Sequence, residues 1–480
     1  MLWVLEVKKN KNIHFVGIKG VGMTPLSIIA KEAGFGVSGS DISEKFITDD
    51  ALKKANIVPK IGFSMDNIHD IDLLITTGAH GGFDNPEVTE AKKRNIPVWT
   101  QGQAVGEFMK GEIFGRNFQG ISVAGSHGKT TTTAMIATIL KDSNLDPSYV
   151  IGTSEISSLG PPGHFGNGKF FVAEADEYAT EPQYDKTPKF FWQHPEILVI
   201  TNIELDHPDL FENVQILRKN FLAFANSIYP SGLLIICGDD EENKKLIKEF
   251  DGKIITYGFS PNNDYIIEKF KEDSENTFFW VSSKGTSLGE FMLSLPGEFN
   301  VLNALAAIIA AIETGLSIDK IKNALKNYKG AKRRFEYIGK LSSGALLFDD
   351  YAHHPTEIKK TLKVFHENYK NKKIVCIFQP HTYSRTKALF DDFVNSFSFA
   401  DVVAIADIYS SLREEKDPSV SSELLVKQMR QIHNNIRQVT GVKDVVEYIS
   451  KNKFDENYVI VTMGAGDIYK ISDQLEFAGN

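Results

Sequence analysis

Residues 118–140 read FQGISVAGSHGKTTTTAMIATIL, and this stretch decides how the chain folds. The apolar run ISVA leads into a turn that contains Gly125 and Gly128, and a helix-forming segment follows. A strand, a glycine-containing turn and a helix in this order are typical of a phosphate-binding loop. The stretch therefore predicts a parallel α/β sheet with a phosphate site at its edge.

The chemistry of this loop lies in Gly125, Ser126, His127, Gly128, Lys129, Thr130 and Thr131. Backbone N–H groups of such a turn point at phosphate oxygens, the lysine reaches the β- and γ-phosphates, and a threonine hydroxyl ligates Mg²⁺. The full pattern G-x-x-x-x-G-K-[ST] has a further glycine where this chain has Val123. A chance GKT at an ordinary turn is the alternative, and the flanking strand and helix argue against it.

Length and composition indicate the number of domains and the kind of protein. A chain of 480 residues predicts about three domains, and 42% hydrophobic with 24% charged residues is ordinary for a folded protein. The net charge of −9 disfavours a nucleic-acid partner. Anionic ligands would have to be bound by local features.

Cys237 and Cys376 each lie in an apolar run, which predicts buried free thiols in strands. The first residues lack the apolar core and cleavage site of a secretion leader, and no run approaches 18 apolar residues. We therefore expect a cytoplasmic protein without membrane insertion.

Strand and helix patterns alternate through three sections, 1–113, 114–329 and 330–480, which predicts α/β domains with parallel sheets throughout, the third section included. The boundaries are placed between Gly111 and Phe118 and near Gly330. Expected strands lie at 13–18, 35–41, 72–78, 96–99, 170–174, 197–202, 232–236, 253–257, 346–351, 373–379, 402–407 and 458–463. Expected helices lie at 22–32, 86–94, 300–315, 318–327, 355–368 and 385–398.

A second glycine cluster follows the first strand and contains Gly17, Gly20 and Gly22, and Asp41 ends the next strand. Such glycines allow a diphosphate to approach the backbone, and the acidic residue meets a ribose hydroxyl. The spacing G-x-x-G-x-G differs from the dinucleotide fingerprint G-x-G-x-x-G, so structural glycines stay an alternative. Two phosphate loops in one chain suggest two phosphorylated ligands.

Polar groups gather where later strands of the second section end. Glu174, Asp176 and Glu177 follow one strand, where carboxylates of a phosphate-loop sheet hold Mg²⁺. Solvated acids at the start of a loop are the alternative. His207 follows the next strand and is equally a ligand or a hydrogen-bonding core residue.

The third section repeats this placement. Asp350, His353 and His354 follow one strand, and Arg385 follows another. Adjacent histidines point to different sides, so at most one of them is expected in a site. Residues 332–334 (KRR) are a solvated linker or a group that contacts phosphate.

Together these segments resemble the Mur ligases, the ATP-dependent amide-forming enzymes of peptidoglycan synthesis. The resemblance covers nearly the whole chain, and it is nearest to the members that join L-alanine to UDP-N-acetylmuramate. It rests on HFVGIKGVGM, VSGSD, NPE, GSHGKTTTT, EADE, TNIELDH, KRRFE, DDYAHHPTE, FQPHTYSRT and MGAGDIY, which occur here in the family's order.

The resemblance implies a Rossmann-like N-terminal domain for the UDP-sugar, a central phosphate-loop ATPase domain and a Rossmann-like C-terminal domain for the amino acid. It also implies an acyl phosphate, formed from ATP and the lactyl carboxylate and attacked by the amine of L-alanine, in a pathway that serves cell-wall biogenesis, cell shape and cell division.

The site residues implied by the resemblance fall into four sets. Lys129, Glu174, His207 and Arg385 are the expected catalytic residues. Thr130, Glu174 and His207 would bind or support Mg²⁺. ATP would meet Gly125, Ser126, His127, Gly128, Lys129, Thr130, Thr131, Asn300, Asn303, Arg334 and Asp350. Substrates would meet Gly20, Gly22, Asp41, His353, His354 and Arg385.

Three departures from the family pattern leave the added group open. Tyr178, Ala179 and Thr180 stand after EADE where the alanine-adding members have Ser-Asp, which is nearer the murein-tripeptide ligases. Thr382 replaces an arginine, and Phe299 replaces a histidine before the asparagine near adenine.

Two other function classes are weaker. A dehydrogenase on the first glycine cluster would leave the phosphate loop idle, and a nucleotide-gated binding protein would close on ATP without chemistry. The expected partners are the small molecules UDP-N-acetylmuramate, ATP and L-alanine. The expected oligomeric state is a monomer or dimer.

Overall fold

The computed structural model describes residues 11–228, 231–273, 276–410 and 414–478. The prediction about a secretion leader concerns residues 1–10, which lie outside this range. Among the described residues no helix combines the length and apolar character needed to cross a membrane. The chain divides into two units. The first comprises Met1–Leu205, Asn213–Ser294 and Glu298–Lys332, and the second comprises Asp206–Glu212, Leu295–Gly297 and Arg333–Asn480.

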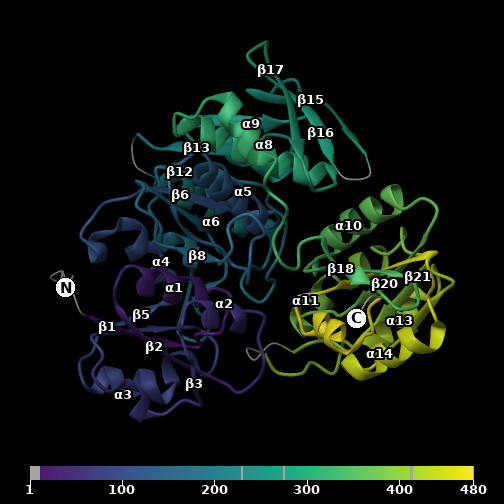
Figure 1. The fold of residues 1–480 in the computed structure, drawn as a ribbon, viewed down its shortest axis with the longest axis horizontal. Helices are drawn as coiled ribbons and strands as arrows, with labels where there is room; N and C mark the ends of the chain where they lie inside the picture. Colours follow the sequence, from purple (N-terminus) through teal and green to yellow (C-terminus); the bar gives the residue numbers. More distant parts are fainter. Residues whose placement is uncertain (1–10, 229–230, 274–275, 411–413, 479–480) are drawn as a thin grey trace. The chain divides into compact units, whose positions relative to one another are not determined.

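The first unit begins with a parallel sheet in the order β3-β2-β1-β4-β5 (Figure 1). Short connections between β-branched strands and helices produce this right-handed α/β pattern. Its strands are β1 (Asn12–Val16), β2 (Gly36–Asp41), β3 (Lys60–Ile61), β4 (Leu73–Thr76) and β5 (Val98–Thr100). Its α-helices are α1 (Thr24–Glu32), α2 (Asp49–Lys54), α3 (Pro86–Lys93) and α4 (Gln101–Lys110).

The second sheet has the order β17-β16-β15-β14-β13-β12-β6-β9-β7-β8 and is parallel from β15 to β7. The strands at its two ends pair antiparallel. Its strands are β6 (Gln119–Ala124), β7 (Ser148–Val150), β8 (Gly163–His164), β9 (Phe170–Glu174), β12 (Ile197–Ile200), β13 (Leu233–Cys237), β14 (Lys253–Gly258), β15 (Tyr265–Glu272), β16 (Thr277–Ser283) and β17 (Thr286–Leu293). A separate antiparallel hairpin joins β10 (Ala179–Glu181) to β11 (Asp185–Pro188).

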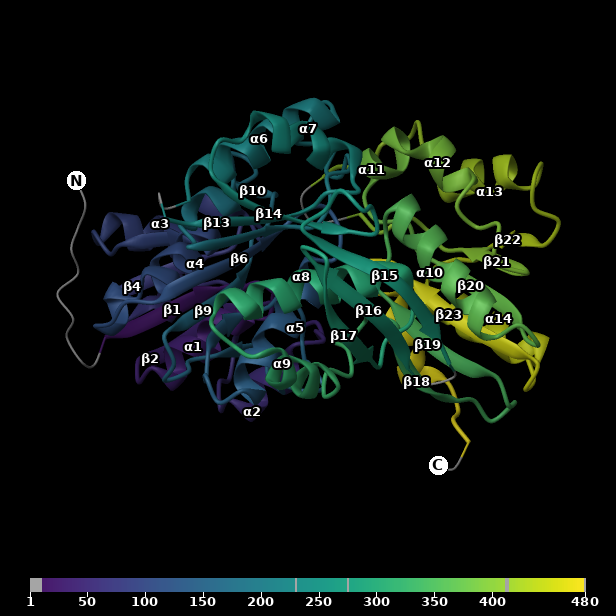
Figure 2. The ribbon, with the colours of Figure 1, turned by 90° about the horizontal axis from the view of Figure 1, so that it is seen from above.

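Helices cover both faces of this second sheet. Figure 2 shows α6 (Val214–Asn226) and α7 (Glu241–Glu249) on one face. On the other face lie α5 (Lys129–Asp142), α8 (Glu298–Glu313) and α9 (Ile318–Leu325), of which α8 and α9 both pack against α5. Helix α8 is Ala-rich and buried along most of its length, so it belongs to the core.

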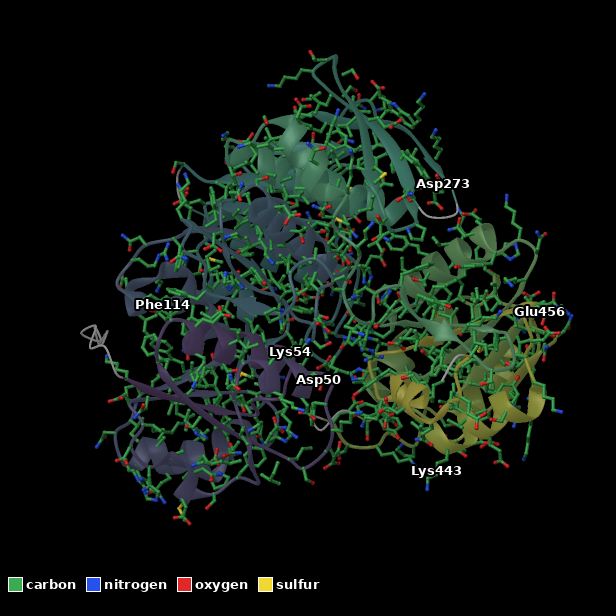
Figure 3. All side chains as sticks on the ribbon, viewed as in Figure 1. Asp50, Lys54, Phe114, Asp273, Lys443 and Glu456 are labelled. Carbon is green, nitrogen blue, oxygen red and sulfur yellow. The ribbon has the colours of Figure 1, made fainter. Side chains whose placement is uncertain are left out.

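The first two sheets share buried contacts within the first unit. Phe114 (labelled in Figure 3) packs against Phe108 of the first domain at 4.9 Å between ring centroids and against Phe165 of the second at 4.8 Å. One core cluster accordingly joins residues of β1 and α1 to Phe171 and Ala173 of β9. Aromatic burial of this size stabilises the pairing of the two domains.

The second unit holds a sheet in the order β18-β19-β23-β20-β21-β22, which is parallel except for β18 at one edge. Its strands are β18 (Glu336–Lys340), β19 (Leu346–Asp350), β20 (Lys373–Phe378), β21 (Val402–Ile405), β22 (Ile436–Gln438) and β23 (Tyr458–Met463). Its α-helices are α10 (Pro355–Asn368), α11 (Tyr383–Ala388), α12 (Phe390–Val394), α13 (Ser422–Met429) and α14 (Gly441–Asn452).

Strand β20 shows how this sheet buries both faces. Ile374, Cys376 and Phe378 join the core under α10, α12 and α13, while Val375 and Ile377 join the core under α14. The alternation follows the two-residue period of a strand. The two cysteines are buried and free, as the sequence predicts, and burial raises the pKa of the Cys237 thiol to about 11.

Two expectations for the third section are wrong. Residues 385–398 form not one helix but α11 and α12, with Leu389 between them at φ −110°. Asp391 and Asp392 then lie in the first turn of α12, where acidic side chains favour a new helix start. The sheet is also not wholly parallel, because β18 pairs antiparallel with β19.

Candidate active site

The phosphate loop joins the end of β6 to the start of α5, as the sequence predicts. Gly125 has φ 126° and Gly128 has φ 82°, conformations that favour glycine. A Cβ at Gly125 would collide with Thr201 Oγ1, and one at Gly128 would collide with Asn303 Oδ1. Both glycines are therefore required by backbone conformation and by close neighbours.

Lys129 lies at the first turn of α5, and its ammonium group faces back over the loop. The Nζ atom donates to the carbonyl oxygens of Gly125 at 2.6 Å and Ser126 at 3.1 Å, and it forms an ion pair with Glu177 at 2.9 Å. The Glu177 side chain is buried, whereas 17% of the Lys129 side chain is exposed. A phosphate at the loop would thus meet a cation that is already oriented. Thr130 and Thr131, next in α5, are both buried.

The segment after β12 holds the loop from its other side. Thr201 Oγ1 donates to His127 O at 2.6 Å, Asn202 Oδ1 accepts from His127 N at 2.9 Å, and Asn202 Nδ2 donates to His127 O at 3.0 Å. Ser126 Oγ also donates to Glu204 O at 2.7 Å. Strand β12 pairs with β6, so their carboxyl ends adjoin. Sequence reasoning missed this role of Thr201 and Asn202, although their place after a neighbouring strand was the available signal.

The three acidic residues that follow β9 differ in their partners. Glu177 pairs with Lys129, and Asp176 pairs with Lys189 at 2.8 Å. Glu174 ends β9, which adjoins β6, and its Oε2 lies so near Gly152 that a Cβ there would stand 2.6 Å away. The structure therefore brings Glu177 to the loop lysine, a pairing that the sequence did not single out.

Asn300 and Asn303, expected near adenine, are both buried on α8. Asn303 lies against Gly128 of the phosphate loop. The contact between α5 and α8 thus brings at least Asn303 to the nucleotide loop.

In the first domain the glycine cluster forms a turn after β1. Gly17 has φ 74°, and a Cβ there would lie 2.5 Å from Thr77 Cγ2, whereas Gly20 and Gly22 do not have positive φ. Asp41 is buried, and its carboxylate accepts from Lys19 N and Ile42 N at 2.8 Å each. Burial raises the pKa of Asp41, although the hydrogen bond from Lys19 opposes this. In this structure Asp41 shapes the glycine turn.

In the second unit Arg385 is buried and pairs with Asp206. The Arg385 Nε atom donates to Asp206 Oδ1 at 2.7 Å, and Nη1 donates to His381 O at 3.3 Å. Burial would raise the pKa of Asp206, but Arg385, His207 and His353 together outweigh burial and hold the pKa well below its usual range. His207, with φ 57°, donates its backbone N–H to the same carboxylate at 2.9 Å.

The two adjacent histidines of the second unit point to different partners, as expected. His353 Nε2 lies 3.8 Å from Asp206 Oδ2 and its Nδ1 donates to Tyr351 O at 3.0 Å. His354 Nδ1 accepts from Thr356 N at 3.3 Å and caps α10. His353 therefore lies beside the Asp206–Arg385 pair.

Asp350 is buried at the end of β19, with oxygens that accept from Phe335 N at 2.7 Å and Ala352 N at 2.8 Å. Burial raises the pKa of Asp350 to about 6, although Arg334 lowers it. Arg334 itself lies 3.8 Å from Glu357.

The basic run 332–334 splits into separate roles. Arg333 is buried, pairs with Asp349 at 2.9 Å and donates to Gly464 O at 2.5 Å. It is therefore neither a solvated linker residue nor a free phosphate contact. Lys332 donates its backbone N–H to Glu155 O at 3.0 Å.

These features define a class of protein: a multidomain α/β enzyme with a nucleoside-triphosphate loop in its largest sheet. The chain belongs to the Mur ligase family, whose members are ATP-dependent ligases. The family's catalytic domain matches residues 12–112, its middle domain matches 123–311 and its glutamate ligase domain matches 333–466.

Individual members of the family show which kinds of Mur ligase the chain is similar to. The chain is 38% identical to a UDP-N-acetylmuramate–L-alanine ligase of Desulfitobacterium hafniense (strain Y51), over 97% of this chain and 99% of that one. A solved UDP-N-acetylmuramate–alanine ligase of Thermotoga maritima is 29% identical with a TM-score of 0.80, covering 96% of this chain and 97% of that one. A murein peptide ligase of Psychrobacter arcticus, at 24% identity over 97% and 98% of the two chains, shares the fold with a TM-score of 0.71.

Proposed function

We propose that this Mur ligase joins L-alanine to the lactyl carboxylate of UDP-N-acetylmuramate, with ATP and Mg²⁺, in peptidoglycan precursor synthesis. The observation that carries the proposal is Lys129, oriented over a phosphate loop by Glu177, in a chain similar over its length to ligases named for this reaction. The murein-tripeptide alternative is not favoured, because relatives 38% identical over nearly the whole chain are named for the alanine-adding reaction.

The proposed reaction has two steps. A lactyl carboxylate oxygen attacks the γ-phosphorus of ATP, the bond to the β-phosphate oxygen breaks, and ADP leaves. The amine of L-alanine then attacks the acyl carbon, loses a proton, and expels inorganic phosphate with the former carboxylate oxygen. Such chemistry depends on positioning and on cations at the transferring phosphoryl group.

Lys129 is assigned to the β- and γ-phosphates. The residues 125–131 supply backbone N–H groups and the N-terminus of α5, which favour negative charge. Glu177 orients the lysine through an ion pair. With ATP bound, the ammonium group would contact both Glu177 and the phosphates. Asn303, beside Gly128, and Asn300 are assigned to the adenine side.

Mg²⁺ would be held by Thr130 and Glu174, with His207 as a supporting residue. The donor set fits, because hydroxyl and carboxylate oxygens are the ligands that Mg²⁺ prefers, and an imidazole suits it less. Bound there, the ion would neutralise charge on the phosphates.

The remaining assignments concern the substrates. Gly20, Gly22 and the turn shaped by Asp41 are assigned to the UDP group. Arg385, His353 and His354 are assigned to the amino-acid side, and Arg334 and Asp350 to the nucleotide. Because Asp206 already binds Arg385, we expect the amino-acid carboxylate to meet the guanidinium atoms that Asp206 leaves available. A cytoplasmic monomer or dimer belongs to the same proposal.

The test is a phosphate-release assay with ATP, Mg²⁺ and UDP-N-acetylmuramate, run against a panel of amino acids and the tripeptide L-alanyl-γ-D-glutamyl-meso-diaminopimelate. We expect release to require the UDP-sugar and to show its highest kcat/KM with L-alanine. A higher kcat/KM with the tripeptide would establish the alternative, and ATP binding without acceptor-dependent release would refute a ligase.

A further inference from the structure

The hairpin formed by β10 and β11 begins just after Glu177, at the point where the chain departs from the alanine-adding pattern. Its turn contains Pro182, Gln183 and Tyr184. The mechanism proposed above gives this hairpin no role, yet it carries a buried carboxylate.

That carboxylate belongs to Glu181, of which only 2% is exposed. Its Oε2 accepts from Gln183 N and Tyr184 N at 2.7 Å each, which closes the hairpin turn. Its Oε1 accepts from Phe83 N, at 3.3 Å, in the first domain. One side chain thus joins the ATP-binding domain to the loop after β4.

The two backbones fit closely at this contact. Gly82 has φ 51°, and a Cβ there would collide with Glu181 Oε1. A Cβ at Gly78 would lie 2.6 Å from Pro182 Cδ. Tyr184 also donates its hydroxyl to Asp84 at 2.8 Å. The hairpin therefore packs against this loop at Gly78 and at residues 82–84.

This loop in turn adjoins the glycine turn of the first domain. His80 Nε2 lies 3.5 Å from Asp41 Oδ1, and Asp41 accepts from Lys19 N. Gly17 lies against Thr77. A displacement of residues 78–84 would therefore disturb the turn that we assign to the UDP group.

We propose that Glu181 is a positioning residue for UDP-sugar binding, through which the ATP-binding domain sets the shape of the glycine turn. The inference rests on the proposed function, because it takes the glycine turn as the UDP-sugar site. It predicts a selective effect on one of the three substrates.

The experiment compares steady-state constants of the full chain with Glu181→Ala, Glu181→Gln and a control. The control, Glu155→Ala, removes an exposed ion pair between the same two domains, in which Glu155 lies 2.8 Å from Lys54 at the end of α2 (Figure 3). Exposed pairs contribute little, so we expect the control to behave like the wild type.

For Glu181→Ala we expect the KM for UDP-N-acetylmuramate to rise about tenfold while the KM for ATP changes less than about twofold. Glu181→Gln keeps one oxygen for the turn N–H groups, so its KM should rise less. Equal rises of both KM values, or a loss of kcat at unchanged KM, would overturn the proposal.

A second measurement does not depend on the reaction. Gly82→Ala is strained by itself, but its methyl group meets the carboxylate only when Glu181 is present. We expect Gly82→Ala to lower the thermal midpoint more in the wild type than in Glu181→Ala. Additive losses would contradict the contact. If the wild type shows no UDP-sugar-dependent release of phosphate, the proposed function is refuted. The comparison of Gly82→Ala in the two backgrounds would still test the contact.

Discussion

The ammonium group of Lys129 meets two loop carbonyl oxygens and the Glu177 carboxylate. These partners stabilise the charge and hold it beside the loop. Removing the side chain would leave the buried Glu177 carboxylate without this cation, so we expect the variant to fold with reduced stability.

We therefore predict that Lys129→Ala lowers kcat/KM by about 10²–10³-fold or more, because it removes a cation from the transferring phosphoryl group. The measurement is phosphate release, together with a cooperative thermal transition that shows the variant still folds. Lys141→Ala, at the other end of α5, is the matched control, since Lys141 contacts Leu159 O and not the loop. Near-normal turnover of Lys129→Ala would refute the loop assignment.

Asp350 gives a prediction about pH. Its pKa is raised from 3.8 to about 6, mainly by burial, so folding favours its protonated form. The associated stability is present below pH 3.8 and is lost as pH rises through about 6. Between these values the wild type should lose about 3 kcal/mol of unfolding free energy relative to Asp350→Asn, which does not titrate there.

Urea unfolding of both proteins at several pH values measures this difference. The hydrogen bond that asparagine loses adds an offset independent of pH, so only the slope is informative. If the difference in unfolding free energy between the two proteins stays constant from pH 4 to pH 7, the raised pKa of the buried Asp350 carboxyl is contradicted.

Among the elements, α4 shows how glycine permits a domain contact. Gly102 and Gly106 face the 3₁₀ helix η4 (Lys189–Trp192), and a Cβ at Gly106 would collide with the backbone oxygen of Trp192. At Gly102 the nearest atom would be Lys189 Cβ at 3.0 Å. The helix and η4 can therefore approach only because these positions lack side chains.

We predict that Gly106→Ala lowers the thermal midpoint, because overpacking against a backbone oxygen costs about 1–3 kcal/mol and outweighs a helix-propensity gain of about 1 kcal/mol. Gly102→Ala should cost less, since the nearest atoms would lie 3.0–3.2 Å from its Cβ, whereas the Trp192 oxygen would lie 2.1 Å from the Cβ of Gly106→Ala. Equal midpoints for the two variants would show that the contact is looser than the structure has it.

The elements also show what could be predicted from the sequence. Residues 355–368 form the expected helix α10, because Pro355 and the capping residue His354 mark its start locally. The break at Leu389 depends on two short helices packing separately. The hydrophobic pattern of residues 385–398 does not reveal this break. In the site, Lys129 was predictable from its motif, whereas its partner lies 48 residues away and Asp206 lies 179 residues from Arg385. Only the tertiary fold brings such pairs together.

For the whole molecule, a net charge of −9 accompanies ligands that are themselves anionic. Local features of the loops offset the repulsion between an acidic protein and anionic ligands. Backbone N–H groups, a helix N-terminus and Lys129 provide positive potential there. The first unit carries both glycine turns, and the second carries Arg385.

The central claim is that the chain activates the lactyl carboxylate as an acyl phosphate. Its most direct test supplies UDP-N-acetylmuramate with ¹⁸O at both oxygens of that carboxylate, together with ATP, Mg²⁺ and L-alanine, and analyses the inorganic phosphate by mass spectrometry. The account predicts one ¹⁸O atom in each phosphate released, in step with formation of the alanyl product. Phosphate without ¹⁸O, alongside the same product, would contradict it.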